Sequence, residues 1–273
     1  MTRTVLAGDF DYEAGGAGYA TQRRTDPRIA ALVHAALGDA RTVVNVGAGA
    51  GSYEPTDRAV TAVEPSAAMR AQRPAHLGAA VDATAEDLPF ADGSFDAAMA
   101  TITIHQWSDP DRGLRELRRV SRGPVVVLTF DGDALDLLWL ADYCPELIAA
   151  ERRRYPAIDH VLDVLGGTGT VTPVPVPVDC TDGFTEAFYA RPERFLDPAV
   201  RASQSAWGFV DETATDRAVG RLAADLASGA WDAAHGHLRS RPEFVGSLRL
   251  LVAEPLPPVG PAEAADADPV EEG

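Results

Sequence analysis

Short apolar, β-branched runs alternate with helical patterns between residues 42 and 130. Five of these runs are strand candidates: Thr42–Val46, Ala59–Val63, Ala79–Val81, Phe95–Thr101 and Val125–Phe130. Helical spacing covers residues 27–37, 66–72 and 110–120, and the first of these helices lies between a capping Asp26 and Gly38. Strands that are apolar throughout are buried on both faces, so the order predicts an α/β fold with a doubly wound, mostly parallel sheet.

The chain after this α/β segment is mainly helical by pattern. Apolar residues recur at helical spacing over 131–169 and again within 184–246, and we expect these stretches to form helical cap insertions. Between them, valine alternates with proline from Val171 to Val178. Because proline cannot donate to a strand ladder, this segment is predicted at a sheet edge, and Ser247–Ala253 is a final strand candidate.

The two ends of the chain differ from its middle. Residues 1–25 show no sustained period and are interpreted as an N-terminal arm or lid, and residues 26–253 as the folded domain. Residues 254–273 contain almost no large apolar side chain and six of the 41 acidic residues. Such a segment cannot bury enough surface to offset its ordering entropy, so an acidic, disordered tail is expected.

The charge balance excludes several classes of protein. With 41 acidic and 24 basic side chains the formal charge is −17, which disfavours nucleic-acid and membrane partners. All basic residues are arginine, so mechanisms that need a lysine amine, such as a Schiff base, are excluded. Two cysteines, Cys144 and Cys180, are too few for a zinc or iron–sulfur site. A reducing, cytoplasmic setting with no structural metal fits this composition.

Candidate ligand-binding residues follow the first two predicted strands. Gly47, Gly49 and Gly51 form a turn that lets a ligand approach the backbone closely. A dinucleotide fingerprint requires a further glycine at the position of Ser52, which disfavours a nicotinamide-dependent oxidoreductase. Glu64 ends the second strand, where a carboxylate can accept hydrogen bonds from ribose hydroxyls, and a solvated strand-end charge is the alternative.

A third motif makes the pattern specific. Residues 84–96 read TAEDLPFADGSFD and lead into another predicted strand. With the glycine turn, Glu64 and Met69, this order resembles the class I S-adenosylmethionine-dependent methyltransferases, in particular the type-11 group of small-molecule enzymes. The resemblance covers residues 10–130 by ordered motifs and residues 131–253 by element order only. It implies a Rossmann-like, seven-stranded fold, S-adenosylmethionine as cofactor, and methyl transfer to an O, N or C nucleophile of a small-molecule acceptor.

The same resemblance implies roles for individual residues. The glycine turn would border the methionine and ribose part of the cofactor, Glu64 would bind the ribose diol, and Met69 would pack on the adenine face. Thr84, Ala85 and Glu86 occupy the segment that contacts the adenine edge. The resemblance places three further residues beside the cofactor: Ala48, Pro65 and Thr101.

Two positions depart from the family pattern. The family usually has an acid where this chain has Asn45, so we expect weaker electrostatic anchoring of the cofactor's ammonium group. Related enzymes often have aspartate at the position of Thr84, so the exocyclic amine would rely on a backbone group or on Glu86.

The arm before the first helix carries further candidates. In the resembling enzymes it folds over the cofactor, where Tyr19 can face the sulfonium and Arg23 can pair with the methionine carboxylate. The neighbouring Arg24 is an alternative for that carboxylate. A basic surface arm with no ligand contact is the other interpretation.

Histidine provides the candidate catalytic group. His105 follows a predicted strand at the carboxyl edge, where ligands bind in open α/β sheets, and is a candidate general base. A purely pocket-shaping histidine is the alternative. His235 and His237 lack a third ligand at suitable spacing, so no metal site is predicted there.

The acceptor site and the activity leave alternatives open. Residues 179–184 are expected either to line the substrate site or to form a turn and helix cap. Aromatic side chains of the cap could form an apolar acceptor pocket or only pack its helices: Trp139, Tyr143, Phe188, Tyr189 and Trp207. A protein that binds the cofactor without methyl transfer, such as a cyclase or a regulatory module, has the same binding motifs. The oligomeric state is left open.

Overall fold

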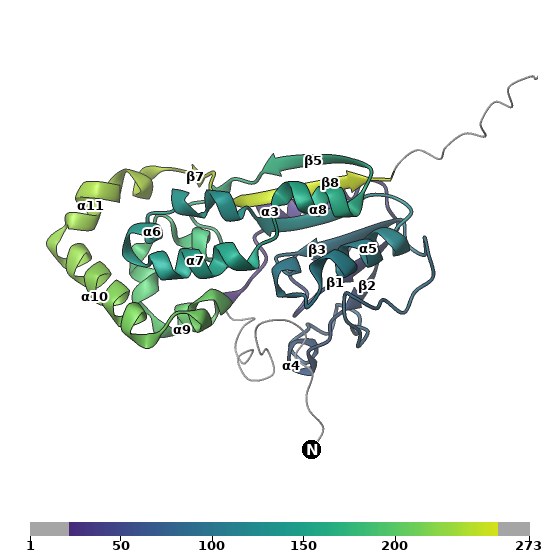
Figure 1. Cartoon of the computed structure of the whole chain (residues 1–273), viewed down its shortest axis with the longest axis horizontal. Helices are drawn as coiled ribbons and strands as arrows, with labels where there is room; N and C mark the ends of the chain where they lie inside the picture. Colours follow the sequence, from purple (N-terminus) through teal and green to yellow (C-terminus); the bar gives the residue numbers. More distant parts are fainter. Residues whose placement is uncertain (1–21, 256–273) are drawn as a thin grey trace, which may run out of the picture.

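The computed structural model describes residues 22–255 and has a six-stranded sheet at its centre (Figure 1). The strand order is β2-β1-β3-β4-β8-β5. The strands β1 to β4 are parallel, and β8 runs antiparallel to both β4 and β5. The bounds of these strands are β1 Thr42–Val46, β2 Ala59–Val63, β3 Ala97–Thr101, β4 Val125–Phe130, β5 Thr168–Pro173 and β8 Leu248–Glu254. A separate two-stranded ladder joins β6 (Val176–Pro177) to β7 (Glu243–Phe244).

Helices and 3₁₀ turns connect the strands. The α-helices are α3 Pro27–Ala36, α4 Ala67–Arg70, α5 Pro110–Val120, α6 Leu140–Tyr143, α7 Pro145–Arg154, α8 Ile158–Leu165, α9 Pro198–Ala202, α10 Glu212–Ser228 and α11 Ala230–His235. The 3₁₀ helices are η1 Ile104–Gln106, η2 Gly132–Leu137, η3 Thr185–Phe188, η4 Pro192–Leu196, η5 Ser205–Phe209 and η6 Gly236–Ser240. In Figure 1 the helices α6, α7, α9, α10 and α11 form a cap to the left of the strands β1 to β3.

Local sequence explains where the main helices begin. The Asp26 carboxylate accepts a hydrogen bond from the Arg28 N–H at 3.0 Å, directly before the proline that opens α3. Asp109 caps α5 in the same way, through the N–H of Arg112 at 3.0 Å. Both helices thus use an aspartate at the N-cap and a proline in the first turn, which satisfies a free N–H and presets the backbone.

The sheet is covered on both faces. Alternate strand residues such as Val43 and Met99 pack with α3 and the cap, whereas Val44 and Val127 pack with α5 and α8. Every residue of β4 is buried. The apolar runs that form β1, β3 and β4 are therefore confirmed as strands that are buried on two sides.

The strand order reverses at β1, because β2 pairs on one side of β1 and β3 on the other. In open α/β sheets, ligands bind outside the carboxyl ends of the strands at such a switch point. The glycine turn after β1, Glu64 after β2 and His105 after β3 all lie at this edge. The topology thus brings together the residues singled out from the sequence.

The described residues differ from the prediction in two elements, and one connection of the sheet is unusual. The main sheet has six strands instead of seven, because the run Ala79–Val81 contributes one bridge, Val63 to Val81, and is too short to extend the ladder. Residues 184–206 form mainly 3₁₀ segments. The connection from β1 to β2, residues 47–58, contains no helix, although parallel strands are usually joined by one.

Other predictions about elements are confirmed or lie outside the described chain. The proline-rich segment supplies β5, which is the edge strand of the main sheet and exposed along its whole length. Of the predicted arm only residues 22–25 are described, and of the predicted tail only Glu254 and Pro255. Glu254 is the last residue of β8, so the predicted boundary at 253 falls inside a strand.

Candidate functional site

The glycine turn after β1 has a backbone that only glycine adopts easily. All three of its glycines have positive φ, between 52° and 97°. A Cβ on Gly47 would lie 2.2 Å from Oγ1 of Thr103, so a side chain there would overlap the segment that follows β3. The N–H groups of Gly47 and Ala48 both donate to the carbonyl of Val63 at 2.9 Å. The turn is therefore held against the ends of both β2 and β3.

Glu64 lies beneath this turn and is 7% exposed. Its Oε2 accepts from the Gly49 N–H at 2.8 Å, and its Oε1 accepts from the Ser66 N–H at 2.9 Å. Burial raises the pKa of this carboxyl, against the lowering effect of the two N–H groups and of Arg70 and Arg73. A solvated strand-end charge, the alternative interpretation of Glu64, does not match this geometry.

Asn45 belongs to a buried polar network. Its Nδ2 donates to Oε2 of Glu54 at 3.2 Å, and Glu54 in turn pairs with Nη2 of Arg73 at 3.0 Å. The Glu54 and Arg73 side chains are only 3% and 4% exposed. Oδ1 of Asn45 is buried without a hydrogen-bond partner. A carboxylate thus does lie beside position 45, but it comes from Glu54 and is neutralised by arginine.

Of the residues predicted beside the adenine, Met69 lies at the same turn, whereas Ala85 and Glu86 lie at the helix α5. The Met69 side chain is buried, and its Cε lies 3.3 Å from where a Cβ on Gly49 would be. Ala85 is buried, and the Glu86 carboxylate accepts from the Asp109 N–H at 3.1 Å, so it caps the start of α5. Three further predicted residues are half-buried: Pro65, Thr84 and Thr101.

The arm residues have different positions from one another. Nε of Arg23 pairs with Oδ1 of the buried Asp182 at 2.6 Å, and the Tyr53 hydroxyl donates to Oδ2 of the same carboxylate at 2.8 Å. Arg24 is exposed. Tyr19 lies outside the described residues. Arg23 is therefore tied to the cap through Asp182.

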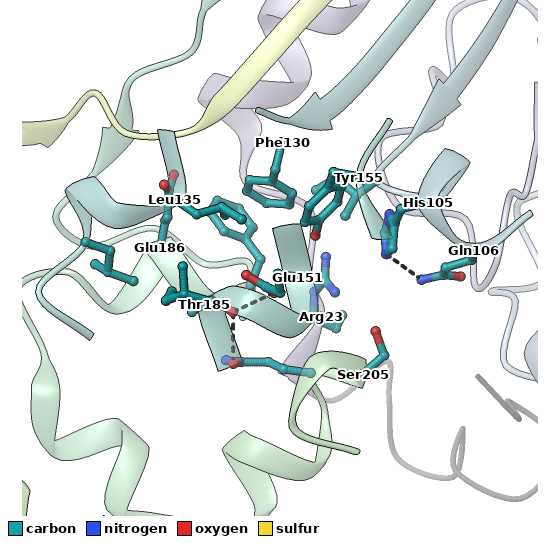
Figure 2. A pocket seen from close by; sticks show the side chains of 15 residues that line it. Arg23, His105, Gln106, Phe130, Leu135, Glu151, Tyr155, Thr185, Glu186 and Ser205 are labelled. Carbon is teal, nitrogen blue, oxygen red and sulfur yellow. Dashed lines mark hydrogen bonds between the residues drawn. The ribbon is translucent and has the colours of Figure 1, made fainter. Parts of the chain in front are cut away.

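A pocket opens beside these groups, between the ends of β3 and β4 and the cap (Figure 2). His105, Tyr155, Arg23 and Glu151 point into its centre in the close-up view. The space measures about 520 Å³ with its opening to solvent included. Six apolar side chains line it: Ile102, Phe130, Leu135, Leu138, Ile148 and Phe184.

Two carboxyl groups line this pocket. Glu151 of α7 is 7% exposed and Glu186 of η3 is 2% exposed. Burial raises the pKa of Glu151 to about 7 and also raises the pKa of Glu186. Thr185 lies between the glutamate of α7 and Gln204, and its hydroxyl is 3.5 Å and 3.1 Å from their side-chain oxygens. The pocket therefore combines apolar walls with few, buried polar groups.

His105 is also buried in this pocket. Burial lowers the pKa of its imidazole well below the usual value, and Arg154 and Arg23 lower it further. Its ring packs against Tyr155 with centroids 4.7 Å apart, and Nε2 lies 3.2 Å from Nε2 of Gln106. Nδ1 has no hydrogen-bond partner. His105 is thus neutral near pH 7.

Backbone strain concentrates at the same place. Ile102 and Tyr53 are the non-glycine residues of the described chain with positive φ, at 52° and 62°. This conformation is unfavourable for a branched or bulky side chain. Ile102 lines the pocket, and Tyr53 donates to the aspartate beside it. Such strain is typical of functional sites, where the surrounding structure enforces it.

The sequence reasoning missed both pocket carboxyls and misplaced the aromatic side chains. Glu151 stands in an arginine-rich helix end, but its spacing of four from the buried Leu147 places it on the apolar face. The cap aromatics named above pack among themselves; the Trp139 ring, for example, lies 5.6 Å from Tyr143 and 5.4 Å from Trp231. Helix packing, the alternative interpretation, accounts for them. In the segment 179–184, Phe184 does line the pocket.

The described part of the chain has two further negative features. Residues 22–255 contain no group of three or more histidine, cysteine, aspartate or glutamate side chains placed to hold a metal ion. No helix within the same range is both long and apolar enough to cross a bilayer.

The sheet topology and the edge with the glycine turn and acidic strand end define a class I methyltransferase fold, and the sequence comparison agrees. Residues 44–127 match the methyltransferase domain family of type 11. Over residues 44–127 the chain is therefore similar to the class I S-adenosylmethionine-dependent methyltransferases. This match covers the strands β2 and β3 and parts of β1 and β4.

Individual relatives extend the comparison. A malonyl-[acyl-carrier protein] O-methyltransferase of Geobacter sulfurreducens is 34% identical over 124 residues, which span 41% of this chain and 45% of that enzyme. A structure from Anabaena variabilis, assigned to the methyltransferases of an antibiotic biosynthesis pathway, is 29% identical with a TM-score of 0.79 and covers 85% of this chain and 98% of its own. The [4+2]-cyclase SpnF is 20% identical with a TM-score of 0.47, over 84% and 82% of the chains.

Proposed function

We propose that this protein transfers the methyl group of S-adenosylmethionine to a small molecule bound in the pocket of His105. One observation carries the proposal. Thr103 packs against Gly47 of the glycine turn, and two residues later His105 lines the pocket. The proposed cofactor and acceptor sites are thus joined by one short segment after β3. Placing two reactants side by side supplies much of the rate of a bimolecular transfer.

The residues at the turn fit the cofactor. Glu64 presents a buried carboxylate at the end of β2, suited to a pair of ribose hydroxyls. Oδ1 of Asn45 is a buried acceptor without a partner, suited to an N–H donor such as an ammonium group. The glycines keep the backbone open to a close ligand. When bound, S-adenosylmethionine supplies a methyl group that its sulfonium makes electrophilic.

The pocket is suited to a small acceptor, and His105 is the candidate general base within it. The apolar walls and the buried polar groups are typical of small-molecule sites. We assign His105 the role of the base that takes a proton from the acceptor, because its neutral imidazole lines the pocket. The net charge of −17 disfavours a nucleic-acid acceptor.

Ligand-dependent stability tests the cofactor assignment. S-adenosylhomocysteine at 100 times its dissociation constant should stabilise the protein by about 2.7 kcal/mol, measured as a shift of the thermal midpoint. NADH is the control. A midpoint that rises with NADH and not with S-adenosylhomocysteine would overturn the assignment in favour of an oxidoreductase.

Turnover tests the transfer itself. The purified protein, given S-adenosylmethionine and a panel of small acceptors, should form S-adenosylhomocysteine. A protein that binds S-adenosylhomocysteine but stays silent with every acceptor would favour the alternative of binding without methyl transfer.

Two variants test the residue roles. Glu64→Ala should weaken S-adenosylhomocysteine binding in calorimetry without unfolding the domain, and unchanged affinity would remove Glu64 from the site. His105→Ala should slow methyl transfer under single-turnover conditions. A rate within about twofold of the parent would retire its role as a base, because a working general base contributes a factor of about 100 or more.

A further inference from the structure

Glu186 lines the pocket, and the protein binds only one of its two carboxyl oxygens. Oε1 accepts from both the N–H and the hydroxyl of Ser247, at 2.6 and 2.7 Å. The backbone of Gly246 approaches so closely that a Cβ there would lie 2.4 Å from Oε1. Oε2 has no hydrogen-bond partner although the residue is 2% exposed. Oε1 is thus fixed by the protein, whereas Oε2 is available to accept a hydrogen bond from a ligand.

Glu151 adds a second carboxyl to the same pocket from the helix α7. It contacts the Thr185 hydroxyl at 3.5 Å, a long distance for a hydrogen bond, and is 7% exposed. Burial raises the pKa of both carboxyls, and the charge of Glu186 raises the pKa of Glu151 further. A ligand that is positively charged and carries several N–H donors would compensate the buried negative charge and also supply the missing hydrogen bond.

The arginines around the two carboxyls do not neutralise both of them, so a positively charged ligand is still favoured. Arg23 is the only guanidinium among the described pocket-lining residues, and Asp182 balances its charge at 2.6 Å. Arg154 acts on Glu151 from its own helix and donates to Ser205 at 3.1 Å. Arg249 acts on Glu186 from β8, and its charge is balanced by Asp131 at 3.2 Å. His105 is neutral, so the pocket keeps an excess of negative charge when both glutamates ionise.

We propose that the acceptor is an amine on an apolar body, whose ammonium group binds between Glu151 and Glu186. Before the nitrogen can take the methyl group, one of these two carboxylates must accept a proton from the ammonium, which leaves a neutral amine with a free electron pair. The aromatic rings of Phe130, Phe184 and Tyr155 would receive the apolar part and, through their faces, part of the positive charge. A carboxylate ligand would add a third negative charge to this pocket, and a neutral alcohol would offer one donor to two carboxyls. This inference names the acceptor class and rests on the proposed function.

Calorimetric titration of the full chain, saturated with S-adenosylhomocysteine, tests the proposal. The probes are 2-phenylethylamine and n-butylamine, each with the matching alcohol, and phenylacetate as the anion. We expect each amine to bind about tenfold or more tightly than its alcohol, since a hydrogen bond to a charged group contributes about 1.5–3 kcal/mol. Phenylacetate should bind least.

Proton release gives a second readout that an apolar contact would not produce. The pKa of Glu151 is about 7 in the free protein, so at pH 7 a bound ammonium should ionise it and release a fraction of a proton. Titrations in two buffers of different ionisation enthalpy measure this release. The heat should be more exothermic in the buffer with the larger ionisation enthalpy for amines, and equal in both buffers for alcohols.

Variants with matched charge changes complete the test. Glu151→Gln should abolish proton release, and both Glu151→Gln and Glu186→Gln should reduce the preference for amines over alcohols to about one. The control is Glu146→Gln on the same helix α7, whose side chain is 42% exposed and outside the pocket. It removes the same charge and should retain the preference.

Failure of this inference is distinguishable from failure of the proposed function. Equal binding of amine and alcohol, tighter binding of phenylacetate, absence of amine binding, or amine heats that do not depend on the buffer would each overturn the amine proposal. The thermal shift with S-adenosylhomocysteine, measured on the same protein and variants, reports separately on the cofactor site and on folding.

Discussion

The carboxylate that is missing at Asn45 is supplied by another residue, Glu54. Asn45 lacks the charge that the family usually has at its position, yet Glu54 places a buried carboxylate 3.2 Å from its amide. Arg73, from beyond α4, neutralises that carboxylate. Removing one partner of such a buried pair typically costs about 3–5 kcal/mol, because the other charge is left without compensation. The site therefore depends on a pair that no single motif contains.

The buried carboxyl of Glu151 should make stability depend on pH. Its pKa is raised from 4.5 to about 7, so the folded state holds the proton more tightly than the unfolded chain does. The stability that this proton contributes to the folded state is complete below about pH 4.5 and is lost as the pH rises to about 7. From pH 5 to pH 8 the parent should therefore lose about 3 kcal/mol relative to Glu151→Gln, which carries no titrating group there.

Denaturant unfolding of both proteins at each pH measures this difference, and all other titrating groups cancel in the comparison. The Glu146→Gln variant is the control, since its side chain is 42% exposed. Parallel pH profiles of the parent and Glu151→Gln would show that this carboxyl titrates normally in the folded state.

Among the elements, the turn after β1 is the most constrained. It links β1 to β2 without a helix, packs against Thr103, and contains glycines in a conformation that other residues rarely adopt. The ion pair of Glu54 and Arg73 lies beneath it, where a crossover helix is usually found between parallel strands. The turn that joins β1 to β2 is therefore also the proposed cofactor site.

Two glycine substitutions separate steric from conformational cost at this element. Gly38→Ala, after α3, places a methyl group at φ 54° with nothing within 4 Å, so it should cost about 1 kcal/mol for the left-handed backbone alone. Gly47→Ala has a similar φ of 70° but meets Thr103 at 2.2 Å. It should cost about 1–3 kcal/mol more and weaken S-adenosylhomocysteine binding.

Urea unfolding of the two variants gives the difference directly. Equal losses would mean that the segment after β3 moves aside at no cost and that the packing of Thr103 on the turn is not a constraint.

For the molecule as a whole, the cap and one face of the sheet share a single apolar core. Buried Val43, Met99 and Val126 of the sheet belong to the same cluster as Trp139 and Trp231 of the cap. The predicted boundaries at 131 and 184 thus mark changes of element type and not of core. The pocket lies where this shared core reaches the carboxyl edge of the strands.

This shared core predicts cooperative unfolding. Trp139, Trp207 and Trp231 lie in the cap, so fluorescence reports mainly on it, whereas far-UV circular dichroism reports on the whole chain. The two signals should give the same denaturant midpoint, as in a two-state transition. A fluorescence midpoint clearly below that of circular dichroism would show that the cap unfolds as a separate unit.

The prediction from sequence was strongest where local rules decide the structure. The bounds of β1, β2, β4 and α5 agree with the structure, because continuous apolar runs and an aspartate–proline start are unambiguous signals. The run Ala79–Val81 was too short to decide between strand and bridge. Residues 184–206 were predicted as α-helix, although tertiary packing holds them mainly as 3₁₀ turns.

By itself the sequence determined the class of the protein: the order of strands and helices, the glycine turn, and an acid at the end of the second strand. Only the tertiary structure decided the acceptor pocket. Glu151, Glu186 and His105 come from α7, η3 and η1, and no local rule indicates that three such segments meet. The physical reason is burial: a glutamate in an arginine-rich helix resembles a surface charge until packing removes its water and raises its pKa.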